Sequence, residues 1–202
     1  MANANKPTGL SPVRYLNGAP WNGAANVYYI PQADTNAYAI GDPVATHSGA
    51  ADSNGVSAVT LATAGASNAS RGVIVGIGRY ETLMADPSNL DSIVIPATKG
   101  HSYYVMVVDD PMVLFEIQEY SGSGSTNFTS ADIGKTVNLK AGANNGFLSG
   151  WTLDDTVASS TASTGQVKLM GISRRTDNSF GSYCKFLCLL NQHELKAATA
   201  GV

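Results

Sequence analysis

The chain has 202 residues, of which only 13% are Asp, Glu, Lys or Arg, about half the roughly 25% of an average soluble domain. Its 12 Lys+Arg and 15 Asp+Glu give a formal net charge of −3, which argues against nucleic-acid binding, and its apolar runs are too short for a membrane-spanning segment. Because charged side chains normally keep a free surface apart from other protein, the composition favours a component of a larger assembly.

Residues 1–26 form the first distinct segment, rich in Pro, Gly and Asn and without hydrophobic periodicity, which predicts an extended N-terminal arm. The segment lacks the apolar stretch of a secretory signal peptide, so we expect synthesis in the cytosol. The arm carries apolar anchors that could lie on its own domain or on a neighbouring subunit: Leu10, Val13, Tyr15, Leu16 and Trp21.

Short runs rich in β-formers then recur, separated by turn residues such as Gly, Asn, Asp and Pro. We predict about ten strands within a single β domain over residues 27–196, followed by a C-terminal tail over 197–202. Short helical turns are expected at Ala131–Lys135 and Asn191–Ala198. The predicted strands are Asn26–Ile30, Pro43–His47, Val56–Ala62, Gly72–Tyr80, Ser92–Ile95, Ser102–Val108, Val113–Tyr120, Thr136–Leu139, Gln166–Arg174 and Tyr183–Asn191.

The alternation of side chains predicts which strand faces are buried. Ser102–Val108 is apolar on both faces and reads as a central strand, whereas Val113–Tyr120 is apolar on one face only. In Gly72–Tyr80, the side chains of Val73, Val75 and Ile77 share one face and three glycines share the other, which would allow a second layer to approach closely. We expect an all-β fold, a jelly-roll or Greek-key sandwich or flattened barrel.

The sequence shows no strong catalytic or metal-binding pattern. It has no Gly-x-Ser-x-Gly motif, and His47, His101 and His193 lie beside turns or strand ends, although a hydrolase is not excluded by counting. Two cysteines, Cys184 and Cys188, lie too far apart along one strand to form a disulfide with each other. We expect no catalytic residue, no metal and no cofactor.

Two other features leave alternatives open. The acidic doublets Asp109–Asp110 and Asp154–Asp155 could open turns or bind Ca²⁺, and turn formation is favoured because neighbouring strand residues point to opposite faces. Aromatic residues concentrate early in the chain, where they could pack in the core, stack on a sugar or contact protein; they are Tyr15, Trp21, Tyr28, Tyr29 and Tyr38.

Several segments carry a resemblance to a known family. The stretches Asn5–Val13, Tyr15–Gly18, Tyr28–Pro31 and Ala39–Val44 are similar to the start of tailed-phage capsid cement or decoration proteins, including podovirus members. Later segments resemble the same family, namely Gly72–Ile77, Tyr104–Pro111 and Leu114–Glu119. The matching motifs are structural, and none carries a catalytic residue.

The resemblance implies a non-enzymatic virion protein on the exterior of the capsid, assembled in the host bacterial cytoplasm. Its implied partners are the major capsid protein and further copies of itself, as a dimer or trimer on a local symmetry axis, with no nucleic acid and no membrane. Such a protein would clamp adjacent capsomers. The alternative is a carbohydrate- or receptor-binding β module of a phage appendage. The candidate interface residues are Leu10, Val13, Tyr15, Leu16, Trp21, Tyr28 and Tyr29.

Overall fold

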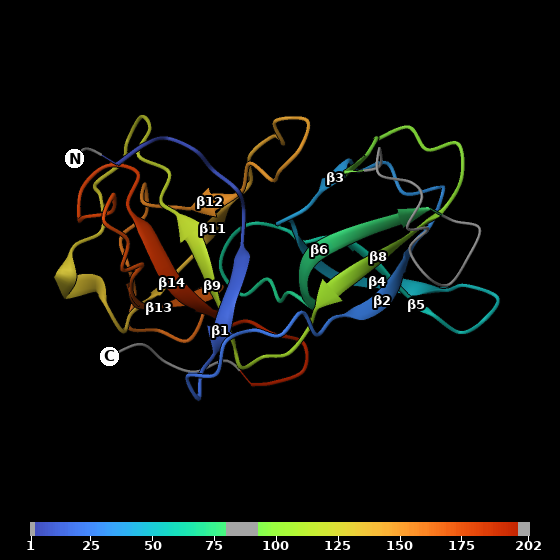
Figure 1. The fold of residues 1–202 in the computed structure, drawn as a ribbon, viewed down its shortest axis with the longest axis horizontal. Coiled ribbons are helices and arrows are strands. Elements are labelled where there is room, and N and C mark those ends of the chain that lie inside the picture. The colour runs from blue at the N-terminus through green and yellow to red at the C-terminus, as the bar shows by residue number, and fades with distance from the viewer. Residues whose placement is uncertain (1–2, 80–92, 198–202) are drawn as a thin grey trace.

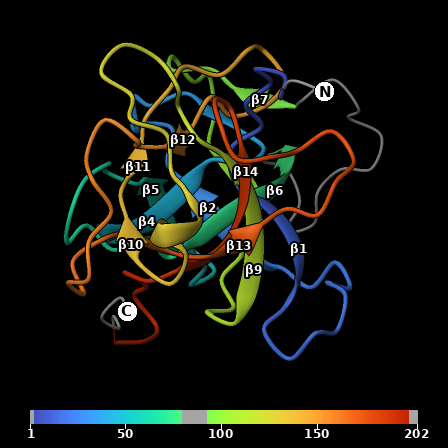
Figure 2. The same cartoon turned by 90° about the vertical axis from the view of Figure 1, so that its left-hand side faces the viewer.

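The computed structural model describes residues 3–79 and 93–197 and shows an all-β chain arranged in two lobes (Figure 1). Figure 2 views it from the side on which β9, β13 and β14 lie in front. The described strands are β1 (Ser11–Tyr15), β2 (Asn26–Ile30), β3 (Tyr38–Ala39), β4 (Pro43–Ala51), β5 (Ser57–Leu61), β6 (Gly72–Arg79), β7 (Val94–Ile95), β8 (Tyr103–Val108), β9 (Val113–Gln118), β10 (Thr136–Val137), β11 (Leu139–Lys140), β12 (Thr152–Leu153), β13 (Val167–Ile172) and β14 (Lys185–Leu190).

The first lobe, here the barrel lobe, contains a closed barrel of strand order β2-β5-β4-β6-β8. Its strands pair antiparallel except at the closing contact, where β2 and β5 run parallel with Tyr29 opposite Ala58. Closure leaves no free edge among these strands. The β-branched residues of β2, β4, β5, β6 and β8 fill the interior, including Ile30, Val44, Val59 and Ile74.

The second lobe, here the sheet lobe, contains a five-stranded antiparallel sheet of order β1-β9-β14-β13-β10. Val113, Phe115 and Ile117 of β9 point into the core as expected, but the opposite face is covered as well, because Leu114 and Gln118 are buried and only Glu116 is partly exposed. The core also takes Trp151 from the segment before β12. Cys184 and Cys188 are free and buried, as expected for apolar thiols.

Strand β6 contributes to both cores and carries a bulge. Val73 packs in the sheet-lobe core and the adjacent Ile74 in the barrel core, as ordinary alternation requires. The register with β8 then shifts between Ile74 and Gly76, so the phase of alternation changes and Ile77 also packs against the barrel core. The prediction that Ile77 shares the face of Val73 is wrong for this reason.

The glycine-faced strand does allow a close approach, but to the chain's own backbone. A Cβ added at Gly72 would lie 2.3 Å from the carbonyl oxygen of Val108 on β8. The close approach at Gly72 is thus to the neighbouring strand of the same barrel and not to a second layer.

The expectation of a separate arm over residues 1–26 needs a correction. Ser11–Tyr15 form β1, which pairs with β9 and makes the edge of the five-stranded sheet. A tight crossing fixes the preceding residues, because the Leu10 amide donates to the Gly41 carbonyl at 2.9 Å. Gly41 has φ +96°, and a Cβ there would lie 2.2 Å from the Thr8 carbonyl oxygen. The early part of the segment is thus built into its own chain.

The remaining predicted elements can be compared with the described residues. All ten predicted strands have a counterpart, although Thr136–Leu139 is divided between β10 and β11. The short strands β1, β3 and β12 were not predicted. A 3-10 helix spans Ser130–Asp132 and overlaps the expected turn, beginning one residue before it, whereas residues 191–197 form bends, turns and bridges instead of a helix. Tyr80, Ser92 and the tail beyond residue 197 lie outside the described residues.

Candidate protein-interaction surface

A shallow groove lies where two turns meet, next to the end of β1. After Tyr15 the chain reverses through a turn in which the Tyr15 amide donates to the Ala19 carbonyl at 2.8 Å. The second turn links β8 to β9, where the Met112 amide donates to Asp110 Oδ1 at 2.8 Å. The Leu16 amide donates to the Met112 carbonyl at 2.8 Å and holds the two turns side by side.

The groove, which we call the N-terminal groove, has a volume of about 440 Å³ and is lined by Tyr15, Leu16, Asn17, Asp110 and Met112. The side chains of Leu16 and Met112 are 45% and 48% exposed. Exposed apolar side chains that gather in a concave site mark a protein-binding surface more often than isolated ones do. Asp110 is the one charged residue in the lining.

The structure brings only part of the predicted interface together. Tyr15 and Leu16 line the N-terminal groove, and Val13 is exposed on the same strand as Tyr15. Trp21 is half-buried against the sheet-lobe core, with its Nε1 donating to the Ala24 carbonyl at 3.1 Å. Tyr29 lies on the barrel lobe, where its hydroxyl contacts Ser102 Oγ at 2.9 Å.

Two predicted interface residues are core residues instead. Leu10 is 1% exposed and packs in the sheet-lobe core. Tyr28 is 5% exposed in the barrel core, and its hydroxyl donates to Asp109 Oδ2 at 2.6 Å. Burial, followed by the Asp109 hydrogen bond, raises the pKa of Tyr28. Both side chains are buried within the chain, so neither is accessible to a partner.

Met112 is the groove residue that sequence reasoning missed. It follows the turn residues Asp110 and Pro111, and a long apolar side chain immediately after a turn is a signal of exposure. The expected strand began one residue later, at Val113, so Met112 was treated as part of the connection. The pairing of Leu16 with Met112 joins segments far apart in sequence, and no local pattern encodes it.

The acidic doublets mainly support local structure. Asp110 caps its turn through the Met112 amide, and Asp154 accepts the Thr156 amide at 3.2 Å. Asp155 is fully buried and accepts the Ser121 amide at 3.1 Å. In the part of the chain that the structure describes, no three Asp, Glu, His or Cys side chains gather closely enough to hold a metal ion.

A buried carboxyl beside Asp155 was not singled out from the sequence. Glu119 is 0% exposed, and its carboxylate accepts the Phe128 amide at 3.0 Å and the Cys184 amide at 3.3 Å. Burial, with a contribution from the nearby Asp155 charge, raises the pKa of Glu119 to about 7. The group anchors the start of the loop after β9 to the start of β14, and its burial keeps it from an external substrate.

One histidine, His193, lies beside a serine, but both side chains are buried. Ser70 and His193 face each other in an isolated parallel bridge, yet they are 1% and 3% exposed. Burial lowers the pKa of His193 to about 4, so its imidazole is neutral at pH 7. Neither side chain is placed to meet a substrate from solution.

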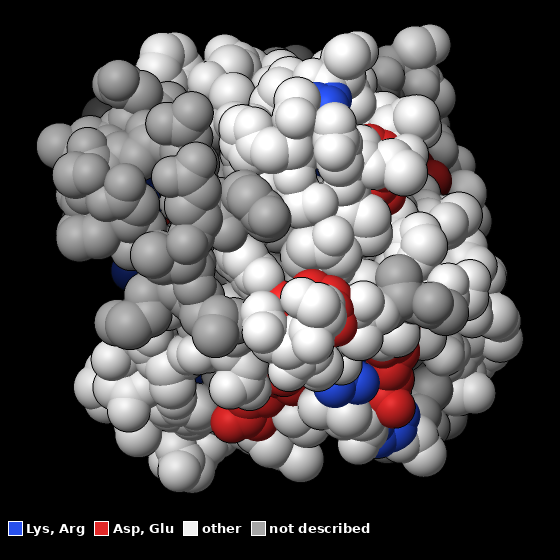
Figure 3. All heavy atoms as spheres, turned by 90° about the vertical axis from the view of Figure 1, so that its right-hand side faces the viewer, with Lys and Arg blue, Asp and Glu red and all other residues white. Residues whose placement is uncertain are grey.

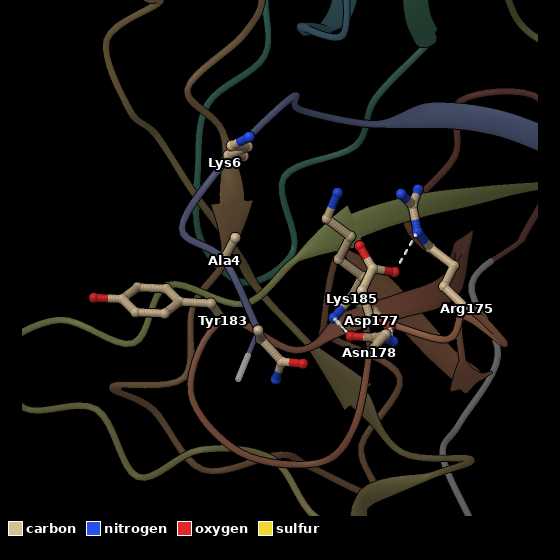
Figure 4. Close-up of a pocket in the computed structure, with 8 residues that line it drawn as sticks. Ala4, Lys6, Arg175, Asp177, Asn178, Tyr183 and Lys185 are labelled. Atoms are coloured by element: carbon tan, nitrogen blue, oxygen red, sulfur yellow. Dashed lines mark hydrogen bonds and ion pairs between the residues drawn. The ribbon is translucent and has the colours of Figure 1, made fainter. Parts of the chain in front are cut away.

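A second pocket is lined in part by the first described residues of the chain (Figure 4). It has a volume of about 160 Å³ and lies between residues 3–6 and the loop that connects β13 to β14. The Asn3 side chain donates to the Ser179 carbonyl at 2.8 Å and accepts the Ser179 amide at 3.0 Å. Arg175 pairs with Asp177 at 3.2 Å within this pocket. These contacts fix the first described residues against the sheet lobe.

One face of the molecule is poor in charge. Figure 3 shows this face, on which most of the described atoms belong to residues other than Lys, Arg, Asp and Glu. Within residues 3–79 and 93–197, no helix is long and apolar enough to cross a membrane. Comparison with protein-family models, with curated proteins and with solved structures finds no match.

Proposed function

We propose that this chain is a non-enzymatic structural protein of a phage virion, which binds the outside of the capsid shell and clamps adjacent capsomers. The observation that carries the proposal is the N-terminal groove, because it exposes Leu16 and Met112 in a chain of which only 13% of the residues are charged. The family resemblance of the sequence supplies the identity of the partner, the major capsid protein.

The proposed mechanism is mechanical. A specific protein interface buries on the order of 1,600 Å² in total. A copy that spans two shell subunits would oppose their separation, because the subunits could separate only by breaking that interface. The turn at residues 15–19 is braced by β1 and by the Leu16–Met112 hydrogen bond. A braced turn loses little conformational freedom on binding, which favours affinity. Self-association as a dimer or trimer on a symmetry axis belongs to the same proposal.

The test is the copy number of the chain in particles purified from cells that produce it, measured by quantitative mass spectrometry. A copy number comparable to that of the shell protein is the expected result. A handful of copies per particle would instead indicate an appendage protein, and absence from the particles would overturn the proposal.

Point variants then test the groove. Deletion of the N-terminal segment is unsuitable, because Leu10 and β1 belong to the fold. Leu16→Ser and Met112→Ser should each reduce occupancy on particles at least tenfold, as expected when an apolar contact at the centre of an interface is lost. Phe147→Ser is the matched control, since Phe147 is 62% exposed and lies outside the groove. Equal occupancy for all three variants would refute the groove's role.

A further inference from the structure

A larger hollow lies on the outer face of the five-stranded sheet. It has a volume of about 610 Å³ and is lined by Arg14, Met170, Gly171, Ile172, Arg174 and Leu187. These residues come from β1, β13, β14 and the residues just after β13. We call it the sheet hollow; it shares no lining residue with the N-terminal groove.

Two bulges shape the sheet hollow. On β13, Leu169 lies opposite Cys188 and Gly171 opposite Leu187, so Met170 is an extra residue, and it is 40% exposed. On β1, the register shifts between Pro12 and Arg14. A bulge of this kind bends the strand and redirects side chains, and bulges are common next to binding sites.

The bulge in β1 determines where Arg14 points. Arg14 lies opposite Leu114 of β9, whereas the core-facing residues of β9 are Val113, Phe115 and Ile117. Tyr15, opposite Val113, packs against the core. The extra residue therefore places Arg14 on the outer face while Tyr15 still contributes to the core.

The charges around the sheet hollow are not balanced. Among the described residues, neither Arg14 nor Arg174 forms an ion pair. Glu116 lies opposite Leu187 on the same face, but Arg175 and Lys185 already pair with it at 3.3 and 3.8 Å. A chain of net charge −3 thus places two guanidinium groups without an ion pair in a hollow that is also lined by Met170, Ile172 and Leu187.

We propose that the sheet hollow binds an extended acidic segment of another protein, with an apolar side chain against Met170 and Leu187 and carboxylates paired with Arg14 and Arg174. Arginine suits this role because its planar group can bind a carboxylate through two parallel hydrogen bonds. Met and Arg are also enriched in protein interfaces. The proposal rests on the proposed function only in that the chain binds protein.

The hollow favours a protein segment over nucleic acid. Its lining holds no aromatic side chain for base stacking, whereas Met170, Ile172 and Leu187 offer apolar contacts to a peptide side chain. A segment that alternates acidic and apolar residues would pair with the two arginines and contact these apolar side chains.

The test uses fluorescent eight-residue peptides that carry zero, two or four acidic residues, with or without a central leucine, and a single-stranded oligonucleotide of matched charge. Binding to the full chain is measured by fluorescence anisotropy. The acidic peptides with leucine should bind at least tenfold more tightly than those without it. Arg14→Ala and Arg174→Ala should each weaken that binding about tenfold, as expected for loss of a charge-assisted hydrogen bond. Lys6→Ala removes one exposed cation elsewhere and should leave it unchanged.

Three results would overturn the proposal: no peptide binding at 1 mM, equal binding with and without leucine, or tighter binding of the oligonucleotide. Equal losses for Lys6→Ala and the arginine variants would also overturn it, because they would indicate attraction to net charge alone. The particle experiment with Leu16→Ser is separate, so failure of the sheet hollow and failure of the proposed function are distinguishable.

Discussion

The buried carboxyl of Glu119 makes the stability of this protein depend on pH in a direction that can be worked out. Its pKa is raised from 4.5 to about 7 by burial. Between these two values the folded chain keeps a proton that the unfolded chain has lost, so stability falls as pH rises and is lowest, for this group, above pH 7. At 1.36 kcal/mol per pH unit, the loss is about 3 kcal/mol.

Glu119→Gln removes the charge and should remove this loss. The unfolding free energy of the variant minus that of the unsubstituted chain should therefore rise by about 3 kcal/mol as the pH is raised from 4 to 8. Urea unfolding followed by the fluorescence of buried Trp151 measures it. The difference between the two chains cancels the other titrating groups, including His193, whose lowered pKa makes stability rise with pH between about 4 and 6.5.

Glu116→Gln is the matched control, three residues earlier on β9. Glu116 pairs with Arg175 and Lys185 on the outer face, so its substitution should lower stability slightly instead of producing a gain that grows with pH. A Glu119→Gln difference that stays constant within about 0.5 kcal/mol from pH 4 to pH 8 would refute the reasoning, because a buried charge must produce a pH-dependent difference.

The remaining predictions concern contacts that fix the fold. Leu10→Ala should cost about 2–5 kcal/mol in urea unfolding, since Leu10 is 1% exposed; a loss below about 1 kcal/mol would mean that the N-terminal segment is not part of the core. Lys99→Met should cost about 3–5 kcal/mol, because Lys99 Nζ lies 3.3 Å from Asp34 Oδ1 in a fully buried pair, and adding Asp34→Asn should recover part of that loss in a double-mutant cycle. Gly41→Ala should lower the melting temperature more than Gly55→Ala, because both have positive φ but only Gly41 has an atom within 4 Å of the added Cβ; equal shifts would contradict the close approach.

Sequence periodicity found every described strand of six or more residues, but it missed β1, β3 and β12. β2 and β8 were predicted almost to the residue because five or six consecutive residues carry the pattern. β3 and β12 have two residues each, too few to show any alternation. Tyr38 and Leu153 are buried in them through contacts distant in sequence, which a local pattern cannot reveal.

The candidate site was predictable only in part. The hydrophobic anchors of the N-terminal segment were visible, but a buried anchor such as Leu10 and an exposed one such as Leu16 look alike in sequence. The bulges in β1, β6 and β13 shift the phase of alternation by one residue, so the faces beyond them could not be assigned. The sheet hollow depends on two of these bulges and therefore had no sequence signal.

The order of the lobes along the chain has a consequence for folding. Every strand of the closed barrel lies between β1 and β9 in sequence, so a growing chain contains the whole barrel before the partner of β1 is made. We expect the barrel to form first and β1 to join the sheet late. Pairing across so long a segment costs loop-closure entropy and slows folding. Refolding should therefore show Trp21, just after β1, reaching its native fluorescence after the barrel tyrosines have been buried.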